Sequence, residues 1–349
     1  MERGNLQEGQ FNTLAQSGTA HTTLPSVLIG GNGSKPSNRG ELSRKAKKKI
    51  ITQKMILSLI DVAKKKNDIV MEKSLWNTYY CQNKLITYEK RIYSKYCKNR
   101  YCTICLGIRK AEMINKYLPV LSSWEDPHFV TLTIRACSAK RLPIMIDGMV
   151  RAFGKIKERN KKRHQRGKGI KLIGIKSLEC NFNPVTKTYN PHYHIIVPNK
   201  EIALQLKTDW LDIWTKKHNE AWCQDIRKIS SIESSLIEII KYGTKIFTEP
   251  DLKNKASRKI SPKIYVAAMY NILSTMKDHR IFDRFGFNLP QTTIEHETKI
   301  ASVTDYDIWI YDPSNADWYS EFTGQVFADF QLDPHLQNLL YNNIDTTLQ

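Results

Sequence analysis

The chain has 349 residues, 41% of them hydrophobic, which is enough to bury a core in two domains with tails. Its formal net charge is +20, from 54 Lys and Arg against 34 Asp and Glu. It has no run of about 18 apolar residues, and its N-terminus lacks the apolar core of a signal peptide. We therefore expect a soluble, cytoplasmic protein with no membrane partner.

The charge is unevenly spread along the chain. From Gln291 to Gln349 ten acids stand against one base, Lys299, so residues 1–290 carry a net charge of +29. A body this cationic attracts polyanions, and nucleic acid is the commonest polyanion in a cytoplasm. Charge alone would equally suit a ribosomal protein or a protein of the membrane surface.

The first segments carry few structural signals. Residues 1–42 are rich in Gly, Ser, Thr and Asn, and we expect a disordered tail. Ser43 is a suitable N-cap for a helix that begins at Arg44 and carries several lysines ahead of its apolar positions. That helix is either a solvated basic surface or a contact for a DNA backbone.

Four of the seven cysteines gather in one segment: Cys81, Cys97, Cys102 and Cys105. The Cys-x2-Cys spacing of the last two makes a tight turn whose thiolates point at a common centre, which two further cysteines can complete as a tetrahedral zinc site. In a reducing cytosol such a cluster indicates a metal rather than disulfides. The sequence predicts a structural zinc site, with free cysteines in a loop as the alternative. Arg100, beside the cluster, is a candidate contact for a phosphate backbone.

A strand and two helices are predicted between residues 106 and 171. Helical patterning covers 106–121 and 141–159, and alternation predicts a strand from His128 to Ile134 with Phe129, Thr131 and Thr133 on one face. Residues 155–171 then carry nine bases and one acid, which suits a loop that grips a DNA strand or one that is merely solvated. The candidate DNA contacts in this loop are Lys161, Lys162, Arg163, Arg166 and Lys168.

The most informative stretch is Asn190-Pro-His-Tyr-His-Ile-Ile-Val197. Successive side chains of a strand point to opposite faces, so His192 and His194 share a face with their imidazoles a few ångströms apart. Two neutral imidazoles so placed can bind one divalent ion. The alternative is a pair of strand histidines that hydrogen-bond to their neighbours.

Glu179 is the candidate third ligand. A predicted strand from Ile170 to Phe182 and the histidine strand flank a turn rich in Asn, Pro and Thr, which indicates an antiparallel hairpin. If Phe182 pairs with Pro191, Glu179 lies opposite His194 and on its face. A slip of one residue would remove Glu179 from that face.

A later amphipathic helix follows a capping-box pattern, Ser230-Ser-Ile-Glu233. Within it Glu238, Tyr242 and Lys245 are spaced four and three residues apart and so share one face. A tyrosine on such a helix is usually an interfacial core residue, so this spacing alone does not predict catalysis.

Together these motifs resemble plasmid rolling-circle replication initiators of the HUH endonuclease superfamily. The resemblance rests on the order of Phe129-Val-Thr-Leu-Thr133, Pro191-His-Tyr-His-Ile-Ile-Val197 and Glu238-Ile-Ile-Lys-Tyr242-Gly-Thr-Lys245. It covers roughly residues 81–285, and the cysteine segment is similar to one that precedes the first motif in the single-tyrosine branch. Many relatives carry a histidine where this chain has Asn190, which leaves Glu179 or a water as the third ligand.

The resemblance implies a site-specific, metal-dependent DNA nickase and strand transferase. Tyr242 would form a covalent 5′-phosphotyrosine link, Glu238 would activate water for a hydrolytic second cut, and Lys245 would assist as a cation. Mg²⁺ or Mn²⁺ would be held by His192, His194 and Glu179, and Zn²⁺ by the four cysteines. The implied partners are plasmid DNA, a host helicase and a polymerase.

We expect an α+β fold with a ferredoxin-like, mostly antiparallel central sheet. The expected boundaries are a tail over 1–42, a basic helix and cysteine segment over 43–122, a nickase domain over 123–250 and a C-terminal region with an acidic tail over 251–349. Two alternatives are a non-catalytic, zinc-dependent DNA-binding regulator, and a relaxase or single-tyrosine transposase. Relaxases place the tyrosine before the histidines and small transposases lack the cysteine segment, which favours the initiator.

Overall fold

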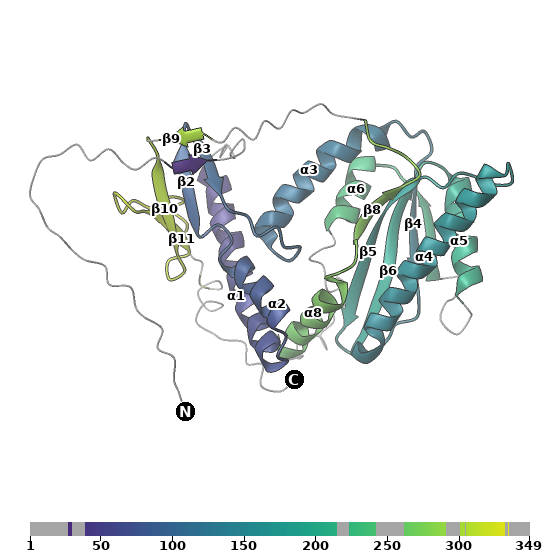
Figure 1. Cartoon of the computed structure of the whole chain (residues 1–349), viewed down its shortest axis with the longest axis horizontal. Helices are drawn as coiled ribbons and strands as arrows, with labels where there is room; N and C mark the ends of the chain where they lie inside the picture. The colour runs from purple at the N-terminus through teal and green to yellow at the C-terminus, as the bar shows by residue number, and fades with distance from the viewer. Residues whose placement is uncertain are drawn as a thin grey trace, which may run out of the picture.

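The computed structural model describes residues 27–29, 39–214, 223–241, 262–290, 301–303, 305–331 and 334. It confirms the predicted α+β class, because helices pack around antiparallel sheets (Figure 1). No helix among these residues is both long and apolar enough to cross a membrane.

A five-stranded sheet forms the centre of the fold, in the order β7-β4-β6-β5-β8 with every neighbour antiparallel. The strands are β4 (His128–Thr133), β5 (Gly174–Asn183), β6 (Thr188–Val197), β7 (Asp225–Lys228) and β8 (Phe282–Phe285). Helix α4 (Leu142–Gln165) follows β4, and α5 (Lys200–Ile213) follows β6. The chain order from β4 to β7 is therefore strand, helix, strand, strand, helix, strand, which is the ferredoxin-like arrangement.

The two faces of this sheet are covered by different helices. Val130, Leu178 and Tyr193 point to the face that packs against α4, α5 and one side of α8 (Pro262–Met276). Phe129, Ile175 and Ile196 point to the other face, against α3 (Thr103–Ser122) and α6 (Ile232–Lys241). Because His192 and His194 alternate with Tyr193, they lie on the face of α3 and α6.

The register of the β5–β6 hairpin differs from the predicted one by two residues. Phe182 pairs with Tyr189, and Glu179 with His192 rather than with His194. An even shift moves a residue along its strand but keeps it on the same face, so Glu179 still faces both histidines.

Strands from both ends of the described chain form a second sheet, β11-β10-β2-β3. Its members are β2 (Lys84–Tyr88), β3 (Arg91–Ser94), β10 (Asp307–Asp312) and β11 (Asp317–Ser320). Its core includes Leu85, Ile92 and Trp318, and Trp318 Nε1 donates to the Gln82 carbonyl. The C-terminal aromatic residues therefore pack against the cysteine segment, so the expected regions 43–122 and 251–349 share a sheet.

Helix α8 joins the two parts of the molecule (Figure 1). Val266, Tyr270 and Leu273 pack against α1 (Arg39–Lys65) and α2 (Ile69–Tyr79), while Ala268 and Ile272 pack in the core of the central sheet. The cysteine segment is thereby held beside the central sheet.

Three predicted boundaries were wrong. Helix α1 begins at Arg39 rather than Arg44, and β1 (Val27–Ile29) pairs with β9 (Ala301–Val303), so the expected tail contains structure. Helix α4 continues to Gln165, so most of the expected basic loop is helical. Strand β5 begins at Gly174, four residues after the predicted start.

Candidate active site

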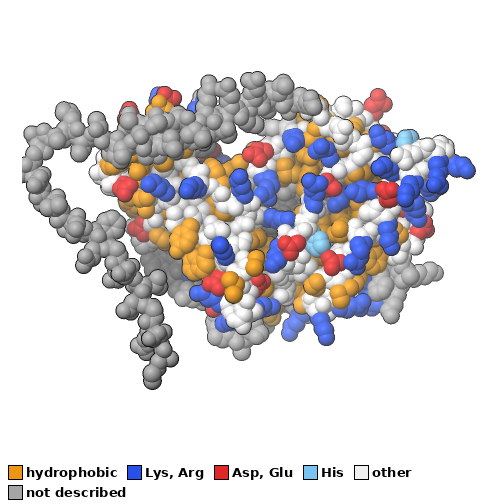
Figure 2. Space-filling view, viewed as in Figure 1, with side chains coloured by type: hydrophobic (Ala, Val, Ile, Leu, Met, Phe, Trp, Pro, Cys, Tyr) orange, Lys and Arg blue, Asp and Glu red, His pale blue; other side chains and the backbone are white. Residues whose placement is uncertain are grey.

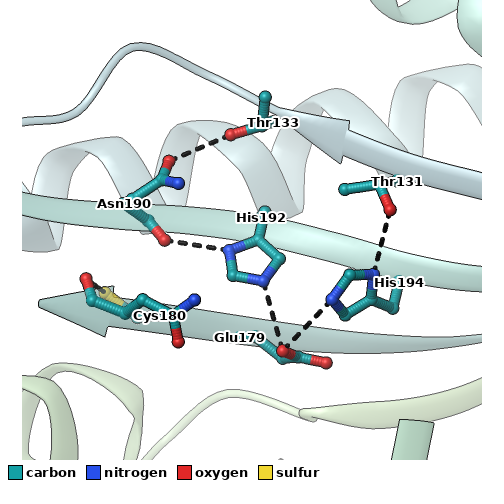
Figure 3. A network of polar contacts seen from close by, with 8 residues as sticks. Thr131, Thr133, Glu179, Cys180, Asn190, His192 and His194 are labelled. Carbon is teal, nitrogen blue, oxygen red and sulfur yellow. Dashed lines mark hydrogen bonds and ion pairs between the residues drawn. The ribbon is translucent and has the colours of Figure 1, made fainter. Parts of the chain in front are cut away.

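The two histidines lie side by side on β6, with ring centroids 4.8 Å apart. The Nδ1 of His192 donates to the Asn190 carbonyl at 2.9 Å, and the Nδ1 of His194 lies 3.1 Å from the Thr131 hydroxyl (Figure 3). Both Nδ1 atoms are thus engaged, and both Nε2 atoms turn toward β5. Thr131 reaches His194 because β4 pairs with β6 and sets these two residues opposite each other.

The Glu179 carboxylate lies between the two imidazoles (Figure 3). Its Oε2 is 3.2 Å from His192 Nε2 and 3.4 Å from His194 Nε2, and the Glu179 side chain is only 1% exposed. The three ligand atoms lie within 4.8 Å of one another.

This donor set fits a divalent cation. Burial lowers the pKa of His192, which favours the neutral imidazole. With its proton on Nδ1, a neutral His192 turns the Nε2 lone pair toward a carboxylate oxygen, and two acceptors face each other. A cation among the three atoms removes that repulsion, and one carboxylate with two imidazoles suits a transition metal such as Mn²⁺.

Helix α6 carries Glu238 to the same face of the sheet. Its carboxylate pairs with Arg227 of β7 at 3.0 Å, and the Arg227 guanidinium stacks 4.5 Å over the Phe129 ring. Phe129 in turn packs against His194, with ring centroids 5.0 Å apart. Glu238 is therefore connected to the histidines through two side chains. Tyr242 and Lys245 lie outside the described residues, beyond the last described residue of α6.

The start of α6 differs from the predicted capping box by one residue. The backbone N–H of Ser234 donates to the Ser231 hydroxyl at 3.3 Å, so Ser231 rather than Ser230 caps the helix.

The structure brings all four predicted cysteines together. The Cys81 and Cys97 sulfurs each lie 3.6 Å from that of Cys105, and one ligand atom from each residue lies within 4.8 Å of the others. Four thiolates around a zinc ion at about 2.3 Å would be about 3.8 Å apart, so the cluster fits tetrahedral zinc. Cys102 is the N-cap of α3 and Cys105 lies in its first turn, where the helix dipole stabilises thiolates.

Hydrogen bonds within the cluster divide its four thiols into two pairs. Hydrogen bonds with Cys102 are the first cause of a lowered pKa for Cys97 and Cys105. Hydrogen bonds with Cys102 and with Cys105 are the first cause of a raised pKa for Cys81 and for Cys102, respectively. The buried Lys49 ammonium lies behind the cluster and donates to the Cys81 and Tyr79 carbonyls at 2.6 and 3.0 Å. Burial lowers the pKa of Lys49 to about 8, while Cys81 acts in the opposite direction.

The family profile described as "Replication protein" matches residues 89–301, which is more than half of the chain and includes the histidine and glutamate set. This chain belongs to that family. It is 25% identical to the Protein rep of a Bacillus species over 41% of this chain and 50% of that one. The Protein rep of Staphylococcus aureus is 24% identical over 48% of this chain and 79% of that one, and that of Streptococcus pneumoniae 25% identical over 47% and 56%.

The chain thus spans only about half the length of two of these three curated relatives. No solved structure gave a significant match. Family membership agrees with the resemblance inferred from the motifs. The matched region begins after Cys81, which is the member of the cysteine cluster furthest in sequence from the other three.

The predicted DNA contacts fall in two places. Lys161, Lys162 and Arg163 lie on the last turns of α4, with Arg166 and Lys168 just after it, and all five are exposed. Figure 2 shows lysine and arginine side chains gathered at this end of α4. Arg100 instead donates to the Met276 and His279 carbonyls at the end of α8, at 2.6 and 2.7 Å. These hydrogen bonds give Arg100 a structural role, because they join the loop before α3 to the end of α8. A contact between Arg100 and DNA stays a prediction.

Sequence reasoning missed the residues that support the ligands. Arg227 and the Lys49 ammonium act through contacts with Phe129 and Cys81, on elements distant in sequence. The Asn190 carbonyl accepts from His192 two residues further along the same strand. For Thr131 a signal was present, since alternation placed it on one face of its strand, but its contact with His194 depends on the β4–β6 register.

Proposed function

We propose that this chain is a plasmid rolling-circle replication initiator that nicks one strand of origin DNA and joins it to a tyrosine. The observation that carries the proposal is the buried Glu179 carboxylate facing the Nε2 atoms of His192 and His194. Family membership supports the replication role.

The chain's own residues prepare the site for a phosphate. Asn190 and Thr131 hold the two imidazoles so that both Nε2 atoms point at Glu179, and α6 and β7 present Glu238 and Arg227 on the same face. A divalent ion bound by Glu179, His192 and His194 would polarise the scissile phosphate and offset its developing charge.

Tyr242 is the proposed nucleophile. Its phenolic oxygen attacks the scissile phosphorus as it loses its proton to solvent, the bond to the 3′ oxygen breaks, and that oxygen is released as a hydroxyl. The phosphodiester bond to Tyr242 conserves the bond energy and can be reversed by a DNA 3′-hydroxyl. Lys245, three residues further on, is a cation that can approach the same phosphate.

Glu238 is the proposed general base for the second cut. A lone tyrosine that is already bonded to DNA cannot attack again, so termination requires another nucleophile. Glu238, four residues before Tyr242, takes a proton from a water, which attacks a phosphodiester and releases a 3′-hydroxyl and a 5′-phosphate. The Arg227 guanidinium holds this carboxylate on the face that carries the histidines.

The zinc site, the basic end of α4 and the partners complete the proposal. Zinc at the four cysteines has a structural role, because four ligands leave no open coordination position. The basic end of α4 grips the DNA backbone and the protein acts in the cytoplasm. A host helicase separates the strands, and a polymerase extends the nicked one. The boundaries at residues 122 and 250 are part of this proposal.

A nicking assay on the plasmid that carries the origin tests this function. Tyr242→Phe deletes the nucleophilic oxygen and little volume, so it should bind the origin as the unaltered protein does but leave the plasmid supercoiled. Normal nicking by this variant would assign the nucleophile to another residue.

Glu238 is tested separately with a plasmid that carries two origins. Glu238→Ala should nick and form the adduct at a near-normal rate but accumulate products that overrun the second origin. Glu238→Tyr should partly restore termination by supplying a second tyrosine. Normal termination by Glu238→Ala would mean that the water is activated elsewhere.

A further inference from the structure

A pocket of about 420 Å³ opens on the histidine face of the central sheet, between α3 and α6. Its lining comes from α3, the end of α6, β5 and the chain entering β8. One lining residue, Ser177 of β5, pairs directly with His194. Side chains of opposed residues in a sheet lie about 5 Å apart, so the pocket lies beside the proposed metal site, one cross-strand pair from His194.

The lining combines an apolar wall with basic groups. Met113, Tyr117 and Phe282 are among the apolar residues, and the ring centroids of Tyr117 and Phe282 lie 5.1 Å apart in an edge-to-face contact. The charged lining residues are four bases and one acid: Arg100, Arg109, Lys116 and Arg280 against Glu112.

Internal contacts hold three of these bases in position. Arg100 donates to the Met276 and His279 carbonyls, Arg109 donates to the Lys98 carbonyl at 2.7 Å, and Arg280 pairs with Asp283 at 3.2 Å. Lys116 is exposed on α3. The result is an apolar space with cations around it, which is the combination that a nucleobase and its flanking phosphates require.

We propose that this pocket takes one unpaired base of the DNA strand, next to the phosphate that is cut. The proposal rests on the proposed function, which places that phosphate at Glu179, His192 and His194. The volume falls in the range of small-ligand sites, and stacking on an aromatic wall accepts any base, so the pocket would hold the strand in register.

The cysteine cluster is connected to this pocket through helix α3. Helix α3, which forms one wall, has Cys102 as its N-cap and Cys105 in its first turn. Zinc at these cysteines would fix the start of the helix whose later turns contact the base. Metal bound in one part of the molecule would therefore position a wall of the DNA site in the other.

Equilibrium binding to two single-stranded probes tests the proposal. One probe is oligothymidylate about 20 nucleotides long, and the other is an abasic strand of the same length and charge. The full zinc-loaded chain, without Mg²⁺ or Mn²⁺, should bind the thymidylate about tenfold more tightly, because one stacked base contributes about 1–3 kcal/mol. Nicking plays no part in this measurement, so it can fail or succeed independently of the proposed function.

Two matched variants on α3 assign the preference to the pocket. Met113→Glu puts a charge in the pocket and should reduce the preference to below about twofold. Asn115→Glu makes the same change of charge at an exposed position of α3 and should keep the preference. Equal binding of the two probes by the unaltered chain, or a preference that survives in folded Met113→Glu, would overturn the proposal.

Photocrosslinking covers the case in which Met113→Glu does not fold. The unaltered chain is irradiated with oligothymidylate that carries 5-iodouracil, and the linked peptides are sequenced. Links to Tyr117, Phe282 or Met113 are expected. Links confined to other elements, such as the basic end of α4, would overturn the proposal.

Discussion

The two candidate metal sites are built in opposite ways. The cysteine site collects four sulfurs from three places: the turn after α2, the loop after β3 and the start of α3. The other site takes Glu179, His192 and His194 from one face of two neighbouring strands. Four thiolates fill the coordination sphere of zinc, whereas three ligands leave room for a phosphate. The contrast supports the structural role proposed for the first site and the chemical role proposed for the second.

The largest change in stability is expected from disrupting the cysteine site. Cys102→Ser, or removal of zinc with a chelator, should unfold the cysteine segment, since binding of structural zinc contributes on the order of 10 kcal/mol to folding. Circular dichroism would show the loss of helix content, and thermal unfolding would show a lower melting temperature. Cys223→Ser, outside the cluster, is the matched control. A Cys102→Ser chain with unchanged melting temperature and helix content would contradict the structural assignment.

Substitutions in the histidine site are expected to reduce nicking without reducing stability or DNA binding. His192→Ala should reduce nicking by about a thousandfold or more, because the metal supplies several kcal/mol of transition-state stabilisation. The melting temperature and non-specific DNA binding should barely change, since that binding depends on Lys and Arg. His164→Ala, at an exposed histidine of α4, serves as the control. A fall in stability as large as that of Cys102→Ser would make the histidines structural.

Among the residues that the structure describes, each part of the molecule contains one lysine with a buried side chain, Lys49 or Lys176. Replacing them with methionine should change the stability in opposite directions. Lys176 lies on the far side of β5 from Glu179, over the rings of Phe153 and Tyr193, and burial lowers its pKa from 10.5 to about 8. Between pH 8 and 10.5 the unfolded chain keeps the Lys176 proton and the folded chain has lost it. The free energy of unfolding should therefore rise with pH over this window, by up to about 3 kcal/mol.

Lys176→Met should remove the Lys176 share of that rise and stabilise the protein at pH 7. The share due to Lys49, whose pKa burial also lowers to about 8, should remain. Chemical denaturation of the unaltered protein and of Lys176→Met between pH 7 and 10.5 measures the free energy of unfolding of each. Lys161→Met, at an exposed lysine, is the control. Identical pH profiles for Lys176→Met and the unaltered protein would contradict the prediction.

Replacing Lys49 with methionine should lower the stability, whereas replacing Lys176 raises it, and the change should be smaller. The Lys49 ammonium satisfies the Tyr79 and Cys81 carbonyls beside the cysteine site, so Lys49→Met should leave buried acceptors without this donor and cost about 2 kcal/mol of stability. Denaturant unfolding at pH 7, compared with the exposed Lys47→Met, tests this. A stabilised Lys49→Met would mean that its desolvation outweighs its hydrogen bonds.

The same contrast explains what could be predicted from sequence. The pairs Cys102 with Cys105 and His192 with His194 are set by local spacing, and the sequence was sufficient to place each pair. Glu179 was placed on the correct face, but opposite the wrong histidine, because hairpin register depends on the turn as well as on alternation. The pairing of β10 with β2 joins residues more than 200 positions apart, and no local pattern indicates it.

The central claim is that Tyr242 is the nucleophile of a site built on Glu179, His192 and His194. Mass spectrometry of the adduct formed with a single-stranded oligonucleotide carrying the nick sequence tests this claim most directly. With Mn²⁺ added, we expect a 5′-phosphoryl link on the peptide that contains Tyr242, and no link with His194→Ala or after chelation of Mn²⁺. A link to another residue, or an equal yield of adduct from His194→Ala, would contradict the claim.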